Sequence, residues 1–429
     1  MKPYGAYTPA ELASERDALT EQYESCKSRG LKLNMTRGVP SLAQLDLSRG
    51  LLTCLGDDEY MAEDGLDCRN YGGLDGIPEM KRIFAAILDL EPDEVIVGGN
   101  SSLALMFDNV ASNMSHGVRD GAPWRSQGQP KFLCPSPGYD RHFSICQYFH
   151  IDMIPVKMTD EGPDMDTVEK LVSTDPMIKG MWCVPVFSNP TGLVYSDETV
   201  RRIARLKPAA ADFRVYWDNA YAIHQFSGEK RRIPNLIREC AEAGNEHIPL
   251  VFASFSKVTF SGAAVTCIAS SRSNCEFIKK RLSMQTIGPD KLRQLMHAKF
   301  FGGAEGVYAH MRKHAAILKP KFDLIEEILS ARLGGRDAAR WTTPEGGYFV
   351  SVNALPGCAR RIVQLCAEAG VSLTPAGATY PYGRDPKDSN IRLAPTFPPL
   401  DELRQAMEVF CLAVKLASVE KQLAADSRA

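Results

Sequence analysis

The chain has 429 residues, of which 44% are hydrophobic and 24% are charged, and its formal net charge is −2 at pH 7. This length predicts a large core with a second, smaller module, and the balanced charge argues against nucleic acid as the main partner. No stretch approaches about eighteen uninterrupted apolar residues, and the chain opens on a polar, acidic helix, so we expect a soluble cytoplasmic protein with no membrane contact.

The twelve cysteines and eight histidines show no metal-binding spacing. Cys134, Cys183 and Cys267 lie within apolar, strand-like runs, and no Cys-x-x-Cys pair occurs. We therefore expect buried reduced thiols rather than disulfides or zinc ligands. The histidines lack the HExxH pattern, and we predict no metal.

Helical patterns and short apolar runs alternate from about residue 45 to residue 305. The expected helices are 77–90, 103–114, 166–173, 197–206 and 275–285, preceded by a first helix at 8–30. The apolar runs are centred on Val95, Phe132, Met153, Met181, Val215, Leu250 and Val265. This alternation predicts an α/β fold with a mostly parallel sheet covered by helices on both faces.

The pattern changes after residue 305. A long helix is predicted from about Glu305 to Leu333, where Gly334-Gly335 ends it. An apolar run at 346–350, a helix near 359–369 and a last helix from Asp401 follow. We therefore expect a large domain over 45–305 and a small α+β domain that includes 306–429, with the long helix as the hinge. The tail 422–429 is expected to fray.

A glycine-rich turn follows the first predicted strand of the large domain. Gly98-Gly99-Asn100-Ser101-Ser102 ends that strand and opens a helix, so free backbone N–H groups and the hydroxyls of Ser101 and Ser102 could hold a phosphate. The alternative is a plain serine N-cap without a ligand.

Three later sets of polar residues also follow predicted buried strands. They are Asn189-Pro190-Thr191-Gly192, Asp218-Asn219-Ala220-Tyr221 and Ser254-Phe255-Ser256-Lys257. Open α/β sheets gather their ligands at the carboxyl ends of their strands.

These residue types fit one cofactor. A lysine stripped of water can form an imine with a carbonyl, which is the role expected for Lys257. Asp218 could pair with a protonated pyridine nitrogen, and Asn189 and Tyr221 could hydrogen-bond a phenolic oxygen. Pyridoxal 5'-phosphate carries all three of these groups.

The chain resembles the fold-type I, PLP-dependent aminotransferases in the order of its motifs, which are Asn189-Pro190-Thr191-Gly192, Asp218-x-x-Tyr221, Ser254-x-Ser256-Lys257 and Arg392-Leu393. Two segments, 36–48 and 287–291, are similar to a bacterial aspartate aminotransferase subgroup, often labelled MocR-type or alanine-glyoxylate-type. The resemblance implies transamination between L-aspartate and 2-oxoglutarate by a ping-pong mechanism. It also implies that residues 1–44 return to the small domain.

Further site residues are implied by the resemblance. Tyr139 would cover the cofactor's pyridine face, and Arg392 would grip the substrate α-carboxylate, with backbone of Gly38 nearby. Ser254 would join the phosphate site. Tyr71 would reach the phosphate of a partner subunit, so a homodimer with shared sites is expected.

Two points depart from the family pattern or stay open. Many members carry a phosphate-binding arginine eight residues after the Schiff-base lysine, where this chain has Val265. The second carboxylate of a four-carbon diacid needs its own cation. The candidates are Arg37, which we prefer, followed by Arg141, then Lys291 and Arg293.

Other functions fit the same motifs. An alanine, aromatic or aminoadipate transaminase, or a β-lyase, could use the same scaffold. A PLP-sensing regulator would need an N-terminal DNA-binding module, for which the early start of the cofactor domain leaves no room.

Overall fold

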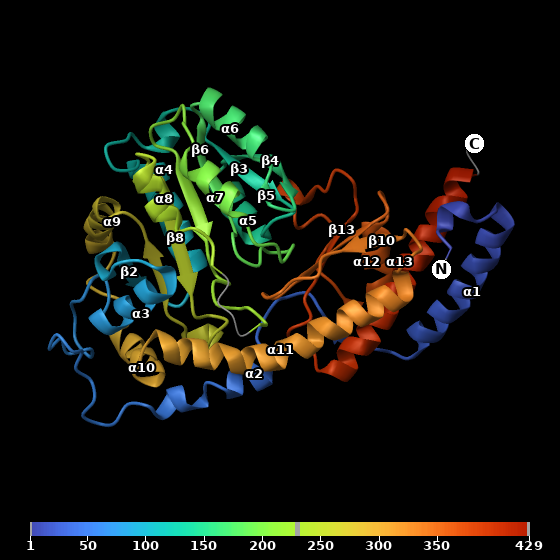
Figure 1. The fold of residues 1–429 in the computed structure, drawn as a ribbon, viewed down its shortest axis with the longest axis horizontal. Coiled ribbons are helices and arrows are strands. Elements are labelled where there is room, and N and C mark those ends of the chain that lie inside the picture. Colours follow the sequence, from blue (N-terminus) through green and yellow to red (C-terminus); the bar gives the residue numbers. More distant parts are fainter. Residues whose placement is uncertain (1, 228–231, 427–429) are drawn as a thin grey trace.

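The computed structural model describes residues 2–227 and 232–426 (Figure 1). The described residues include an eight-stranded central sheet, in which the strands lie in the order β2-β9-β8-β7-β6-β3-β4-β5. Their bounds are β2 Val95–Gly98, β3 Lys131–Ser136, β4 Asp152–Thr159, β5 Gly162–Pro163, β6 Ile178–Cys183, β7 Arg214–Asp218, β8 Pro249–Ser254 and β9 Thr266–Ala269.

The central sheet is mostly parallel. Strands β8, β7, β6, β3 and β4 run parallel to one another, β9 is antiparallel to β8 and β2, and β5 is antiparallel to β4. Along β7, Val215 and Trp217 enter one hydrophobic core while Tyr216 enters another. Since successive side chains point to opposite faces, both faces of the sheet are buried. The predicted α/β class is confirmed.

Helices cover both faces of the sheet (Figure 1). They are α3 Pro78–Leu88, α4 Ser102–His116, α5 Asp140–Tyr148, α6 Met165–Thr174, α7 Asp197–Ala204, α8 Leu236–Glu242, α9 Arg272–Gln285 and α10 Lys291–Phe301. Several begin at a side-chain N-cap, such as Ser196 before α7 and Asn235 before α8, which satisfies free N–H groups of the first turn.

Most of the remaining elements form a second body at the other end of the molecule, while α11 Ala304–Leu333 extends under both bodies and α2 Leu42–Asp46 lies along it (Figure 1). A three-stranded sheet, β10-β11-β13, packs with the helices, and a short β1-β12 pair joins the two chain ends. The bounds are α1 Pro9–Ser28, β1 Leu33–Asn34, α2 Leu42–Asp46, α11 Ala304–Leu333, β10 Ala339–Trp341, β11 Val350–Ala354, α12 Ala359–Glu368, β12 Val371–Ser372, β13 Asn390–Leu393 and α13 Leu400–Asp426.

The N-terminal segment packs into this second body. Leu12 and Leu19 of α1 share a hydrophobic core with Leu403 and Phe410 of α13. Helix α11 contributes to both bodies, since its first half enters the core of the large sheet and its second half enters this one. We propose two domains on this basis, 45–305 and 1–44 with 306–429, connected by α11.

Two smaller expectations can be compared with the structure. Cys134, Cys183 and Cys267 are buried free thiols, as predicted. The expected fraying of the tail is wrong for 422–426, which continue α13, and 427–429 lie outside the described residues. Within the described ranges, no helix is long and apolar enough to cross a membrane.

Candidate active site

A cavity of about 210 Å³ lies where the central strands end. The loops after β2, β3, β6, β7 and β8 all contribute to it, as expected for an open α/β sheet. Its lining residues are Asn100, Ser101, Ser102, Leu103, Met106, Tyr139, Val184, Asn189, Asp218, Ala220, Tyr221, Ser256, Lys257 and Ser261. The structure therefore brings seven of the predicted residues together, namely Ser101, Ser102, Tyr139, Asn189, Asp218, Tyr221 and Lys257.

Lys257 lies in the loop between β8 and β9. Its ammonium nitrogen is 4.9 Å from the centre of the Tyr221 ring. Burial lowers the pKa of Lys257 below its ordinary value, and the nearby Asp218 carboxylate opposes part of that shift. A lowered pKa increases the fraction of neutral amine, which is the nucleophilic form.

Hydrogen bonds fix the backbone around Lys257. The Tyr348 hydroxyl donates to the Lys257 carbonyl at 3.3 Å. The Ser254 hydroxyl accepts from the Ser256 N–H at 3.0 Å, and Ser254 does not line the cavity. Ser254 therefore shapes the turn that presents Lys257, and its contact with the phosphate stays a prediction.

Asp218 ends β7 and is 4% exposed. Its Oδ2 accepts a hydrogen bond of 3.0 Å from Nε2 of His142, whose ring stacks on Trp182 at a centroid distance of 4.4 Å. Its Oδ1 is buried and has no partner. Because a buried carboxylate oxygen is expensive to leave unpaired, this atom indicates that a donor from a ligand binds here.

Two tyrosines and Asn189 surround the same space. Burial raises the pKa of Tyr139 to about 12 and the pKa of Tyr221 well above its ordinary value, so both hydroxyls stay protonated and can donate. Asn189 is buried in the loop after β6, and its Oδ1 accepts from Arg392 at 3.2 Å. This bond links the cavity to β13.

The turn after β2 holds the serines of the predicted phosphate site. Ser101 caps α4, since its hydroxyl accepts from the Ala104 N–H at 3.3 Å, and it also lines the cavity. The N-cap and the phosphate site are therefore compatible here. The positive end of the 15-residue helix α4 faces the space where an anion would be stabilised.

Asn100 and Ser261 were not predicted, although both line the cavity. The Asn100 side chain donates to the Gly262 carbonyl at 3.1 Å, which ties the β2 turn to the loop that carries Lys257. Ser261, four residues after Lys257, could have been found as a hydroxyl in the same loop.

Val265, which stands where many family members carry a phosphate-binding arginine, is fully buried in the core. Among the described residues that line this cavity, Lys257 is the one cation.

Arg392 extends from β13 toward Asn189. Its guanidinium also donates to Asp140 at 2.9 Å and to Thr374 at 3.3 Å, and it lies 4.9 Å from the Phe349 ring. Its Nε is buried without a partner. One donor therefore remains for a carboxylate. Asp140, which directly follows Tyr139, gave no signal in the sequence.

Gly38 lies against the aromatic ring that covers Arg392. A Cβ atom at Gly38 would be 2.5 Å from Cζ of Phe349, so only glycine allows this close approach. The neighbouring Arg37 is exposed and does not line the cavity.

The remaining predicted residues lie apart from this cavity. Arg141 is exposed, Arg293 pairs with Asp290 at 3.2 Å, and Lys291 is buried beside the Tyr71 loop. Tyr71 is 76% exposed and does not line the cavity of its own chain.

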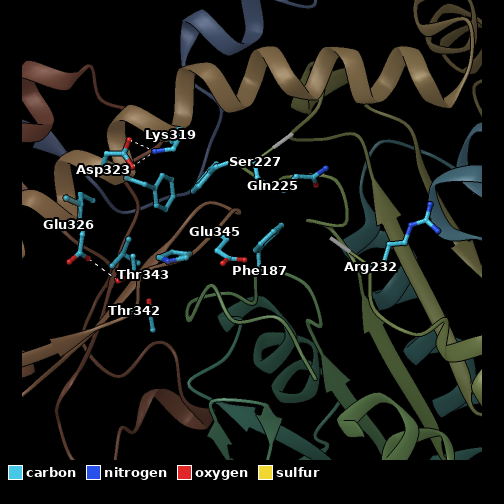
Figure 2. Close-up of a pocket in the computed structure, with 15 residues that line it drawn as sticks. Phe187, Gln225, Ser227, Arg232, Lys319, Asp323, Glu326, Thr342, Thr343 and Glu345 are labelled. Atoms are coloured by element: carbon cyan, nitrogen blue, oxygen red, sulfur yellow. Dashed lines mark hydrogen bonds and ion pairs between the residues drawn. The ribbon is translucent and has the colours of Figure 1, made fainter. Parts of the chain in front are cut away.

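A larger cavity of about 750 Å³ lies between the second half of α11 and the loop that holds Phe187 (Figure 2). Three of its charged groups are already engaged, because Lys319 pairs with Asp323 at 2.7 Å and Glu326 accepts from Thr343 at 3.0 Å. None of the predicted cofactor residues lines it. The smaller cavity around Lys257 is therefore the candidate active site.

Comparisons with known proteins agree with this geometry. A family model described as aspartate amino-transferase matches residues 7–426. An aspartate aminotransferase of Corynebacterium glutamicum is 45% identical over 403 residues, which cover 94% of this chain and 93% of that protein.

Solved structures show the same fold. An aspartate transaminase of Corynebacterium glutamicum has a TM-score of 0.96 at 43% identity, over 98% of this chain and 99% of that one. An α-aminoadipate aminotransferase of Thermus thermophilus, complexed with N-(5'-phosphopyridoxyl)-L-leucine, has a TM-score of 0.72 at 18% identity, over 93% and 95% of the two chains. These matches confirm the predicted resemblance to aminotransferases of fold type I.

Proposed function

This chain belongs to the aspartate aminotransferase family and is a transaminase with pyridoxal 5'-phosphate as its cofactor, and we propose that it transfers the amino group of L-aspartate to 2-oxoglutarate. The relative that is 45% identical carries the name aspartate aminotransferase, which supports aspartate as the donor. Within the structure, the proposal depends on one observation, which is that a buried lysine and an unpaired aspartate oxygen share a cavity whose Asn189 is hydrogen-bonded to Arg392.

The residues present fit the cofactor. When bound, pyridoxal phosphate supplies a carbonyl for amine exchange and a ring that accepts electrons from the substrate. Oδ1 of Asp218 would accept from the ring N–H, and Asn189 and Tyr221 would bond the phenolic oxygen. The N-terminus of α4, with Ser101 and Ser102, would hold the phosphate.

The chain's own groups then perform the proton transfer. The Nζ of Lys257, once replaced by the substrate amine, would act as the base that takes the proton from the substrate Cα. Its lowered pKa keeps the amine ready for this role. Asp218 would keep the ring nitrogen protonated, while His142 holds the Asp218 carboxylate in place.

Arg392 would bind the α-carboxylate of both substrates, because a 2-oxo acid and an amino acid share this group. The free Nε provides one donor, and the substrate would replace Asp140 at Nη1. Use of one site for both substrates would give ping-pong kinetics.

A four-carbon diacid has a second carboxylate that needs a cation. We propose Arg37 for this role, because it adjoins Gly38, whose segment packs on the Phe349 ring beside Arg392. Arg37→Ala should raise KM for aspartate and 2-oxoglutarate at least about tenfold, and should raise KM for alanine and pyruvate much less. Arg141→Ala tests the second candidate, and it should change these four KM values little if Arg37 supplies the cation. A uniform loss across all four substrates would show that Arg37 is structural.

A donor panel tests the substrate assignment directly. The bound cofactor changes its absorbance when it receives the amino group, so each amino acid can be scored in a single half-reaction. Aspartate should react with the highest kcat/KM. A preference for alanine, an aromatic amino acid or aminoadipate, or elimination as in a β-lyase, would overturn the aspartate assignment and leave the family intact.

The alternative of a PLP-sensing regulator is not retained, because the chain is a transaminase.

We also propose a cytoplasmic homodimer with shared active sites. Three large apolar side chains are exposed in this region. The exposed fractions are 76% for Tyr71, 86% for Met284 and 62% for Ile287. The Tyr71 loop and the Ile287 loop touch, since a Cβ at Gly288 would be 2.3 Å from the Gly72 carbonyl oxygen. Exposed apolar side chains gathered in this way are typical of an interface between subunits.

A further inference from the structure

A third cavity, of about 970 Å³, lies between the two bodies of the molecule. Strand β4 of the central sheet forms one wall, and β10, β11 and the 380–389 loop form the other. We call this space the cationic cavity. Its volume falls in the range of small-molecule sites.

Cations outnumber carboxylates in the lining of the cationic cavity, although the chain carries a net charge of −2. Lys157, Arg340, Arg384 and Lys387 line it, and Asp337 is the one carboxylate among the described lining residues. No ion pair within the described part of the chain involves any of these four cations. By contrast, the cavity of Figure 2 pairs Lys319 with Asp323 and is lined by further acids.

The loop that carries two of these cations is rigid. The buried Asp385 carboxylate accepts from the backbone N–H groups of Lys387 at 2.9 Å, Ser389 at 2.8 Å and Asn390 at 2.8 Å. These bonds fix the turn on which Arg384 and Lys387 stand. The backbone of this turn is thus organised before any ligand binds, which reduces the entropy lost on binding.

Strain also marks this loop. Tyr382 has φ 58° and ψ 17°, a left-handed conformation that is rare for an aromatic residue. Its hydroxyl accepts from the Met153 N–H of β4 at 2.9 Å, which connects the two walls of the cavity. Strained residues of this kind cluster at ligand sites.

Part of the cavity lining is apolar. We call this part, which includes Pro137, Pro155, Leu355, Tyr380 and Pro381, the apolar floor. A bare inorganic ion would leave this surface in contact with water. An apolar or aromatic body would cover the floor while the charged groups face the cations.

We propose that the cationic cavity binds a small organic oxyanion that has an apolar or aromatic body and at least two negative charges, as a nucleotide does. This site is separate from the cavity around Lys257, and neither lining residue set includes a member of the other. The proposal does not depend on the amino donor that the enzyme uses.

The two cavities are connected through the backbone. Ser136 and Pro137 line the cationic cavity, and the same segment continues to Tyr139 in the active site. Ser389 also lines the cationic cavity, and it directly precedes β13, which carries Arg392. A bound oxyanion would therefore hold the two segments that position Tyr139 and Arg392.

The test is calorimetric titration of the cofactor-loaded enzyme with three probes, which are ATP, tripolyphosphate and 1-anilinonaphthalene-8-sulfonate. ATP should bind once per chain at submillimolar concentration and at least about tenfold more tightly than tripolyphosphate, because only ATP can cover the apolar floor. The sulfonate carries one negative charge and should compete with ATP only weakly. Competition as strong as that of ATP itself would overturn the requirement for two charges.

Charge reversal locates the site. The double variant Arg384→Glu, Lys387→Glu should weaken ATP at least about tenfold, and Lys157→Glu, on the opposite wall, should weaken it independently. The control reverses two exposed cations elsewhere, Arg205→Glu and Lys207→Glu, with the same change in net charge. Absence of saturable binding for all three probes, or an equal loss in the control, would overturn the proposal. Unchanged melting temperatures of the variants exclude misfolding.

Discussion

The unpaired oxygen of Asp218 makes this residue the most sensitive position in the active site. Asp218→Asn keeps the shape and the partner His142 but removes the charge that would hold the cofactor ring protonated. We expect kcat to fall at least about a hundredfold, the size of a lost electrostatic stabiliser. Steady-state assays on the fully loaded variant measure this. Near-normal turnover would contradict the role, and His142→Phe should show a smaller loss.

Lys257 provides the side-chain amine that would bind the cofactor in the active site. Lys257→Ala should abolish turnover, and borohydride should then fix no cofactor to the chain, because the other described residues that line this cavity carry no side-chain amine. Mass spectrometry of the reduced protein detects the adduct. Lys257→Arg keeps the positive charge and serves as the control, since it should fail equally. A reducible adduct in either variant would assign the chemistry to a different lysine.

At the scale of elements, helix α11 carries two buried histidines beneath the Lys257 loop. His310 donates to the Val258 carbonyl at 2.9 Å, and Nδ1 of His314 accepts from Gln44 at 3.0 Å. Burial lowers the pKa of His314 to about 3, and His310 adds to this shift. Burial likewise lowers the pKa of His310. Both histidines are therefore neutral in the folded enzyme near neutral pH.

These shifts predict acid sensitivity with a definite sign. The ordinary histidine pKa of about 6.5 applies to the unfolded chain, so the unfolded state binds more protons below that pH. Stability is therefore complete above about pH 6.5 and falls as the pH decreases toward the folded pKa. At pH 5, unfolding of His314→Gln should take up about one proton fewer than the wild type, measured by pH-stat titration in guanidinium.

The sequence predicted the elements of this fold unevenly. Helices with clear periodicity and caps were located within a few residues, such as 77–90 for α3 and 305–333 for α11. The helix α5 was missed, because Asp140–Tyr148 directly follows a proline- and glycine-rich turn that masked its start. That omission also hid Asp140 and His142, whose partners Arg392 and Asp218 are distant in sequence. Motifs after strands identified the cofactor residues, but only the fold shows which groups already have partners.

At the scale of the whole molecule, Lys257 is the one cation among the described residues that line the active-site cavity, and Tyr71 lies exposed elsewhere. If a partner's Tyr71 completes each site, two inactive variants should complement each other. Mixing Tyr71→Ala with Lys257→Ala creates heterodimers in which one of the two sites has both residues intact. Random exchange of subunits should then restore about a quarter of the wild-type activity.

The control for this experiment uses two residues that belong to the same chain's cavity. Lys257→Ala mixed with Asp218→Asn leaves every site of the heterodimer with one defect, because Lys257 and Asp218 line one cavity together. This mixture should stay inactive, whereas the Tyr71 mixture should recover. Sedimentation under the assay conditions must show a dimer in both mixtures. Equal recovery in the two mixtures, full activity of a monomer, or no recovery in an impaired Tyr71 mixture would each contradict a site built from two subunits.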